Sequence, residues 1–172
     1  LSMELEQILY NVQKPTWYSG GEYGAVVKDK KDVNIRFAFC FPDLYEIGMS
    51  HLGIKILYDC LNKVPDIWCE RVFMPNDDME EEMKKNNIPL FALESKDSIK
   101  DFDFIGFTIQ YEMCYSTILE MLSLAEVPLL AKDRNQGDPI IIGGGPCTCN
   151  PEPVADFFDL FSIGEGENNL VE

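Results

Sequence analysis

The chain has 172 residues, of which 46% are hydrophobic and 26% charged, an ordinary composition for a globular domain that buries a core. Its 14 basic and 30 acidic residues give a formal net charge of −16 without a basic stripe, which argues against direct nucleic-acid binding by this segment. No apolar run reaches the roughly 18 residues of a membrane span, and the first residues lack a signal-peptide layout. We therefore expect no membrane contact and a cytoplasmic location.

Residues 1–32 differ from the rest of the sequence. Residues 5–12 favour a short helix, an aromatic and glycine-rich stretch follows at 14–22, and a charged break follows at 28–32. We interpret this region as an arm that packs on the main domain or on a neighbour. The main domain is expected to span residues 33–172.

From residue 34 onward, predicted strands and helices alternate. Apolar runs predict strands at 35–41, 67–73, 90–93, 102–109, 139–142 and 157–163. Apolar residues at helical spacing predict helices at 51–62 and 115–125, and N-cap candidates at 76–78 predict a charged helix that runs to Lys85. Such alternation implies right-handed βαβ units and therefore an α/β fold with a mostly parallel sheet.

The first predicted strand runs into an acidic segment that contains glycine. Residues 43–48 read Asp-Leu-Tyr-Glu-Ile-Gly, and a helix is expected to begin near His51. Open α/β sheets bind ligands beyond the carboxyl ends of their strands, where a loop at 43–48 would lie. Asp43, Tyr45 and Gly48 are therefore candidate binding residues, whereas His51 is interpreted as a polar residue at a helix start.

Two later segments should reach the same edge of the sheet. Thr108 offers a hydroxyl to a ligand at the end of a strand, next to Gln110, although a β-branched residue is also ordinary there. Gly143, Gly144 and Gly145 leave room for a flat ligand or its tail, although three glycines also suit a tight turn. Thr108, Gln110, Gly143 and Gly144 therefore join the candidate site.

The sequence offers no catalytic constellation. It has one histidine and scattered acids, so no nucleophile–base pair stands out. Cys147 and Cys149 are one residue apart, and no second pair completes a four-ligand zinc site. The other cysteines lie among apolar neighbours, as reduced thiols do. We expect a binding module without catalytic residues or a metal site.

The sequence resembles a known protein family along nearly its whole length. Residues 43–48 are similar to the D-x-H-x-x-G signature of cobalamin-binding domains, with tyrosine in place of histidine. The longer run 41–53, which contains these residues, resembles together with further segments the N-terminal region of radical S-adenosylmethionine (radical SAM) proteins that carry a cobalamin-binding-like domain. These further segments are residues 14–22, 71–73, 93–95, 105–112, 143–146, 150–153 and 163–167.

The resemblance implies a flavodoxin-like three-layer fold, placed before a C-terminal radical SAM barrel that this sequence lacks. It implies cobalamin as cofactor, bound without a histidine ligand from the protein. S-adenosylmethionine and a 4Fe–4S cluster would belong to the full-length protein, and the expected partners are its barrel and a small-molecule corrinoid. The residues implied near the corrinoid or its tail are Asp43, Tyr45, Gly48, Thr108, Gln110, Gly143 and Gly144.

Two alternatives stay open. The domain could keep this fold without a corrinoid and serve as a structural module that docks on the radical SAM barrel. It could also be an ordinary flavodoxin-like domain for a nucleotide or flavin. Against the latter, the junction after the first strand lacks the glycine pattern that cradles phosphates.

Overall fold

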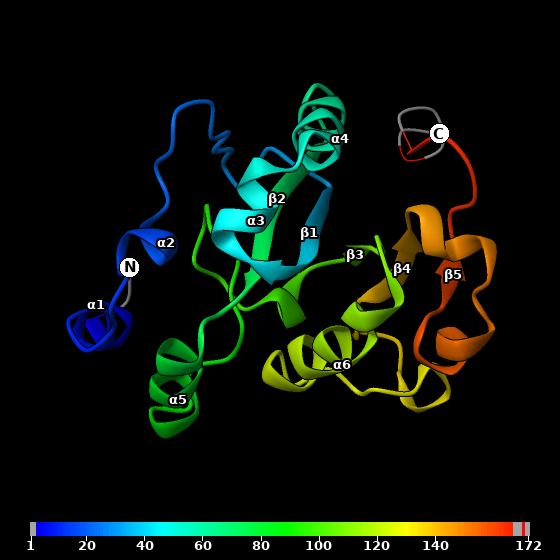
Figure 1. The fold of residues 1–172 in the computed structure, drawn as a ribbon. Coiled ribbons are helices and arrows are strands. Elements are labelled where there is room, and N and C mark those ends of the chain that lie inside the picture. Colours follow the sequence, from blue (N-terminus) through cyan, green and yellow to red (C-terminus); the bar gives the residue numbers. More distant parts are fainter. Residues whose placement is uncertain (1–2, 167–169, 171–172) are drawn as a thin grey trace.

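The computed structural model describes residues 3–166 and residue 170. Its five strands form one sheet in the order β2-β1-β3-β4-β5, and all neighbouring strands are parallel (Figure 1). This order is that of flavodoxin-like folds, so the predicted fold class is confirmed. The strands are β1 (Ile35–Leu44), β2 (Ile67–Met74), β3 (Phe104–Thr108), β4 (Ile140–Gly144) and β5 (Leu160–Phe161).

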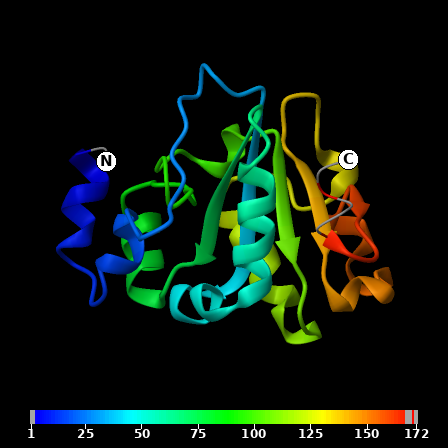
Figure 2. The same ribbon diagram turned by 90° about the horizontal axis from the view of Figure 1, so that it is seen from above.

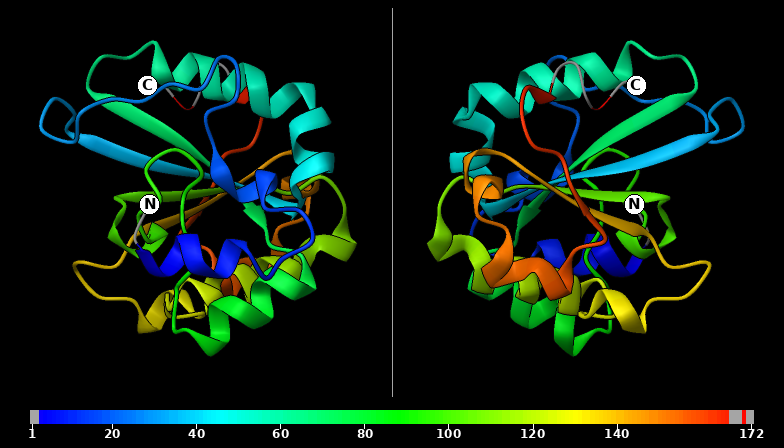
Figure 3. Two further views of the ribbon diagram at one scale, coloured as in Figure 1. Left: turned by 90° about the vertical axis from the view of Figure 1, so that its left-hand side faces the viewer. Right: turned by 90° about the vertical axis from the view of Figure 1, so that its right-hand side faces the viewer.

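Helices cover both faces of the sheet. Helices α3 (Tyr45–Ser50) and α4 (Leu52–Asn62) lie on one face, and α5 (Asp77–Lys85) and α6 (Tyr115–Leu124) lie on the other (Figure 3). Short 3-10 helices occur in the connections, at Ile99–Asp101, Glu112–Cys114, Ala131–Asp133, Pro146–Cys149 and Glu152–Phe157. The three layers follow from the strands, because a sheet that is apolar on both faces must be covered on both.

Strand β1 shows how the sequence produces the two cores. Phe37 and Phe39 pack toward α4, whereas Ala38 and Cys40 pack toward α6 on the opposite face. Successive side chains of a strand point to opposite faces, so an unbroken apolar run is needed where both faces are buried. The apolar run at 35–41 is therefore a strand at the centre of the molecule.

The N-terminal arm packs on the main domain. It contains α1 (Met3–Leu9) and α2 (Thr16–Ser19), and Leu5, Ile8 and Trp17 are buried in the core that also contains residues of α5 and α6. In Figure 2 the arm, in blue, lies on the β2 side of the sheet. The division of the chain at residues 32 and 33 stays a prediction.

Two local predictions are wrong. Residues 90–93 are not a strand of the sheet: Phe91 makes one isolated bridge with Ser98, and Leu93 N–H donates to the Arg71 carbonyl at 2.8 Å. All four residues are buried, and a short buried apolar run has the same composition whether or not it forms a ladder. Residues 43–48 are not a loop either, because β1 continues to Leu44 and α3 follows at once.

Within the described ranges, no helix has both the length and the apolar character that crossing a bilayer requires. The cysteines all lie in this part of the chain, and all are free thiols.

Candidate functional site

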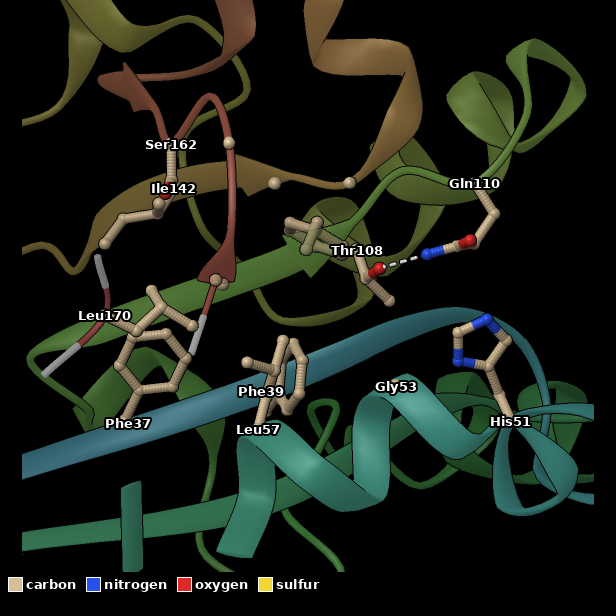
Figure 4. A pocket seen from close by; sticks show the side chains of 16 residues that line it. Phe37, Phe39, His51, Gly53, Leu57, Thr108, Gln110, Ile142, Ser162 and Leu170 are labelled. Carbon is tan, nitrogen blue, oxygen red and sulfur yellow. Dashed lines mark hydrogen bonds between the residues drawn. The ribbon is translucent and has the colours of Figure 1, made fainter. Parts of the chain in front are cut away.

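A cavity of about 200 Å³ lies between α4 and the sheet and reaches the ends of β3 and β4, and we call it the slot (Figure 4). The sheet order places β1 and β3 side by side, with β2 on one side and β4 on the other. The chain therefore reverses its direction across the sheet between β1 and β3, which is where open α/β sheets bind ligands. The slot is lined by Phe37, Phe39, His51, Gly53, Leu57, Gly106, Phe107, Thr108, Gln110, Ile142, Gly144, Gly145, Ser162, Gly164, Gly166 and Leu170.

The walls of the slot are mainly apolar and partly aromatic. Phe37 and Phe39 come from β1, Leu57 from α4 and Ile142 from β4 (Figure 4). A cavity of about 150 Å³ already accepts benzene, whereas pockets for whole drug-sized ligands start near about 300 Å³. The slot therefore has room for a flat aromatic part of a ligand, while a larger ligand would extend out of it.

Glycines shape the slot in two ways. A Cβ on Gly106 would lie 2.5 Å from the Phe37 ring, so glycine in mid-strand allows that ring to pack against β3. A Cβ on Gly144 would meet only the Phe107 carbonyl oxygen, at 4.0 Å, and would otherwise project into open space. The backbone at Gly144 is thus a place where a ligand can approach closely.

Polar groups lie where the slot opens at the strand ends. The Gln110 side-chain amide donates a hydrogen bond to the Thr108 hydroxyl at 2.5 Å (Figure 4). The His51 ring packs beside Phe41, with ring centroids 5.3 Å apart. Its Nδ1 is buried and has no hydrogen-bond partner among the described residues, so Nε2 is the nitrogen that a ligand can reach.

Ser162 also lines the slot, and the close-up shows it beside Ile142 and well away from His51 (Figure 4). Its hydroxyl oxygen is also buried and has no hydrogen-bond partner in the part of the chain that is described. The described lining of the slot therefore combines an apolar middle with the Ser162 hydroxyl beside Ile142 and an amide, a hydroxyl and an imidazole near the strand ends.

Tyr45 points away from the slot. Its ring stacks on Trp17 at 6.0 Å and meets Phe73 edge-on at 5.4 Å, and its hydroxyl donates to the Glu22 carboxylate at 2.9 Å. Burial and the bond to Glu22 raise the pKa of Tyr45 to about 12, so the phenol is neutral near pH 7. These contacts with the arm and with β2 account for the direction of the side chain, which the expectation of a loop at 43–48 did not include.

The other residues of the segment 43–48 also have structural partners. Asp43 accepts a hydrogen bond from the Tyr111 hydroxyl at 2.8 Å, and this bond raises the pKa of Tyr111. A Cβ on Gly48 would lie 2.3 Å from the Phe73 ring, so glycine is required for α3 to pack on β2. Neither residue lines the slot.

Of the predicted site residues, Thr108, Gln110 and Gly144 line the slot together. Gly143 faces the other side of the sheet, where a Cβ would lie 2.7 Å from the Phe161 ring. Successive strand residues alternate between the two faces, so only one of the two neighbouring glycines can face the slot.

The sequence analysis did not predict that apolar side chains form the walls of the slot, nor that His51 lines it. The phenylalanines of β1 carry no distinguishing signal, since a core strand shows the same pattern. Gly106 does carry one, because glycine inside a strand often marks close approach by another group. No group of three or more His, Cys, Asp or Glu side chains within residues 3–166 and 170 is arranged to hold a metal ion.

Comparison with known proteins gives two matches. The family described as radical SAM proteins, N-terminal, matches residues 53–172. The uncharacterized protein MJ0966 of Methanocaldococcus jannaschii is 31% identical over 137 residues, which cover 78% of this chain and 24% of that relative. The chain thus corresponds to only a part of the relative's length. No solved structure matches the chain.

Proposed function

Since the chain belongs to the family described as "Radical SAM proteins, N-terminal", we propose that it is the corrinoid-binding module of a radical SAM enzyme. The observation that carries this proposal is the slot at the β1–β3 switch point, with Thr108 and Gly144 at the strand ends. These are the places where cobalamin-binding domains resembling this one present a serine and glycines to the corrinoid tail. The rest of the corrinoid would lie across the carboxyl edge of the sheet.

The residues of the slot fit a corrinoid tail. Phe37, Phe39 and Leu57 provide apolar walls for a flat base, and Gly144 has no side chain where the base would enter. Thr108 and Gln110 provide a hydroxyl and an amide at the opening, where the polar linker of the tail would pass. The slot is too small for a macrocycle, which agrees with a ligand that is only partly enclosed.

We also propose that the protein supplies no histidine ligand to the corrinoid. Tyr45, at the position of the histidine in the cobalamin signature, bonds to Glu22 and faces the arm. His51 Nε2 is reachable, but Nδ1 has no acceptor among the described residues, and such an acceptor usually orients a metal-bound imidazole. The axial environment would thus be set by packing and solvent exclusion.

When bound, the corrinoid supplies methyl-group or electron transfer at its cobalt. The chain's own residues would bind the tail, orient the ring and exclude water from its lower face. In the full-length protein, S-adenosylmethionine and a 4Fe–4S cluster would belong to the radical SAM barrel, which is the proposed partner of this module. A cytoplasmic location, consistent with the free thiols, is part of the same proposal.

The first test is a titration of the purified full-length protein with hydroxocobalamin and methylcobalamin, followed by gel filtration and an absorbance spectrum of the protein peak. We expect the corrinoid to co-elute and to show the spectrum of a cobalamin whose lower base is not coordinated. A spectrum with histidine coordination would contradict the proposed binding mode. Cobalamin that separates completely from the protein would contradict corrinoid binding.

A second candidate function is a docking module that keeps the fold without a corrinoid. The apolar walls favour it, because Phe37, Phe39 and Leu57 could equally receive apolar side chains of an adjoining domain. Complete separation of cobalamin from the full-length protein would support this second function.

A further inference from the structure

We infer that Tyr111 is a fixed aromatic platform on which the flat face of the corrinoid rests, and that Asp43 positions its ring. This inference rests on the proposed function and extends it to two residues outside the slot. It follows from the place of Tyr111 at the edge of the sheet, from the bonds that hold its side chain, and from its exposure to solvent.

The Tyr111 side chain spans the switch point at the carboxyl edge of the sheet. Tyr111 follows shortly after the end of β3, and its hydroxyl donates to the Asp43 carboxylate, near the end of β1, at 2.8 Å. Strands β1 and β3 are neighbours, and the chain reverses its direction across the sheet between them. A ligand that lies across this edge therefore meets the side chain of Tyr111.

Tyr111 is held at its backbone and at its hydroxyl. Its carbonyl accepts from the Cys114 N–H at 3.3 Å and from the Cys114 thiol at 2.9 Å. The bond from its hydroxyl to Asp43 raises the pKa of Tyr111, so the phenol is protonated and remains a donor near pH 7. These bonds hold the ring in one orientation before a ligand binds.

Although it is held in this way, Tyr111 is 43% exposed. Fixing a side chain in one rotamer costs conformational entropy, which burial of apolar surface offsets in a core. At Tyr111 the protein provides only part of that burial, and a ligand that covers the ring would provide more. An aromatic ring is a flat apolar surface, which suits the flat face of a macrocycle. Because the ring is already oriented, little further entropy is lost on binding.

Asp43 is a positioning residue in this arrangement. One of its carboxylate oxygens accepts the Leu44 N–H at 2.8 Å, and the other accepts the Tyr111 hydroxyl. Asp43 thus ties the connection after β3 to the end of β1. Loss of the carboxylate and loss of the hydroxyl should free the ring in the same way, so the two residues should act as a unit in binding.

The test measures the affinity of the full-length protein for hydroxocobalamin by equilibrium dialysis. We expect Tyr111→Ala, which removes the platform, to bind at least about tenfold more weakly. Tyr111→Phe and Asp43→Ala, which free the ring, should each bind about three- to fivefold more weakly. The double variant Asp43→Ala/Tyr111→Phe should bind no more weakly than either single variant, because each change removes the same bond.

The outcomes separate the inference from the proposed function. If the unmodified protein binds hydroxocobalamin and Tyr111→Ala binds it equally well, the platform is overturned while the proposed function stands. If the losses of Asp43→Ala and Tyr111→Phe add up in the double variant, the positioning role of Asp43 is overturned. If the unmodified full-length protein binds no hydroxocobalamin, the proposed function fails and the inference fails with it.

A purely structural role of Tyr111 would leave the absorbance spectrum of the bound cobalamin unchanged. We expect the visible bands to shift in Tyr111→Ala, because solvent replaces the ring beside the corrinoid, and an unchanged spectrum would overturn the contact. The matched control is Tyr10→Ala, since Tyr10 is 90% exposed and belongs to the arm on the β2 side (Figure 2). Thermal unfolding checks each fold. If Tyr111→Ala fails to fold, the cycle of Tyr111→Phe and Asp43→Ala still decides.

Discussion

At the scale of single residues, the buried arginine of β2 is held by two carboxylates. Arg71 Nε donates to the Glu94 carboxylate at 2.6 Å, and a terminal nitrogen of its guanidinium donates to Glu22 at 2.9 Å. The Glu94 side chain is 1% exposed, and its other oxygen accepts the Arg71 backbone N–H at 2.8 Å. Burial raises the pKa of Glu94, and Arg71 opposes this effect, so the carboxylate depends on its partner.

Replacement of this arginine should be costly. Arg71→Met would leave Glu94 buried without its cation, and we expect the free energy of unfolding to fall by about 3–5 kcal/mol in urea denaturation. Lys63→Met is the matched control, because the Lys63–Asp59 pair is exposed and such pairs contribute little to stability. Similar losses in the two variants would contradict this account of the buried pair.

A second carboxylate makes stability depend on pH. Burial disfavours the charged form of Asp97, but hydrogen bonds and ion pairs with Lys30 and Arg36 outweigh burial and lower its pKa below the ordinary value of 3.8. A carboxylate whose pKa is lower in the folded protein adds stability above its unfolded pKa, and this stability is lost as the pH falls through the folded pKa.

We therefore expect the stability difference between the unmodified protein and Asp97→Asn to be constant near neutral pH. It should shrink as the pH falls below 3.8. Urea denaturation at a series of pH values measures this difference. A difference that grew on acidification would mean that the sign of the Asp97 effect has been assigned wrongly.

At the scale of elements, the N-terminal arm holds α3 in place. Lys14 pairs with Glu46 at 3.0 Å, Trp17 stacks on Tyr45, and Glu22 accepts from the Tyr45 hydroxyl. All three contacts reach the first turn of α3, the helix that replaces the predicted loop between β1 and α4. The arm therefore fixes the element that the sequence had marked as the ligand-binding segment.

A substitution at Tyr45 can distinguish a structural role of this residue from a role in ligand binding. Tyr45→Phe removes the hydroxyl that bonds to Glu22, and we expect the free energy of unfolding to fall by about 1–2 kcal/mol. Corrinoid affinity, measured by equilibrium dialysis of hydroxocobalamin against the full-length protein, should change by less than about twofold, because the ring faces the arm and not the slot. A tenfold loss of affinity without a loss of stability would place Tyr45 at the ligand.

At the scale of the whole molecule, the sheet order determines where a ligand can bind. The crossovers through α4 and α6 lie on opposite faces, so the chain leaves β1 and β3 toward opposite sides of the sheet, and the slot lies between the sheet and α4 (Figures 1 and 3). The position of the slot follows from topology, whereas its chemistry depends on which side chains face α4.

Much of the fold could be predicted from local patterns. The run at 35–41 and the helical spacing at 115–125 became β1 and α6, because strong periodicity and burial act in the same direction there. Residues 90–93 could not be assigned in this way. They are buried by contact with other elements while making one isolated bridge, and composition does not reveal whether a partner strand is present.

Part of the candidate site could likewise be predicted from the sequence, and part could not. The sequence by itself determined the α/β class, the strand ends at which a ligand is expected, and the positions of Thr108 and Gly144 at those ends, because these depend on residue order along single strands. The tertiary structure decided that Tyr45 faces the arm, that Gly143 faces the opposite layer, and that Phe37 and Phe39 form the walls. The direction of a side chain depends on the packing of elements distant in sequence, and no local pattern contains that information.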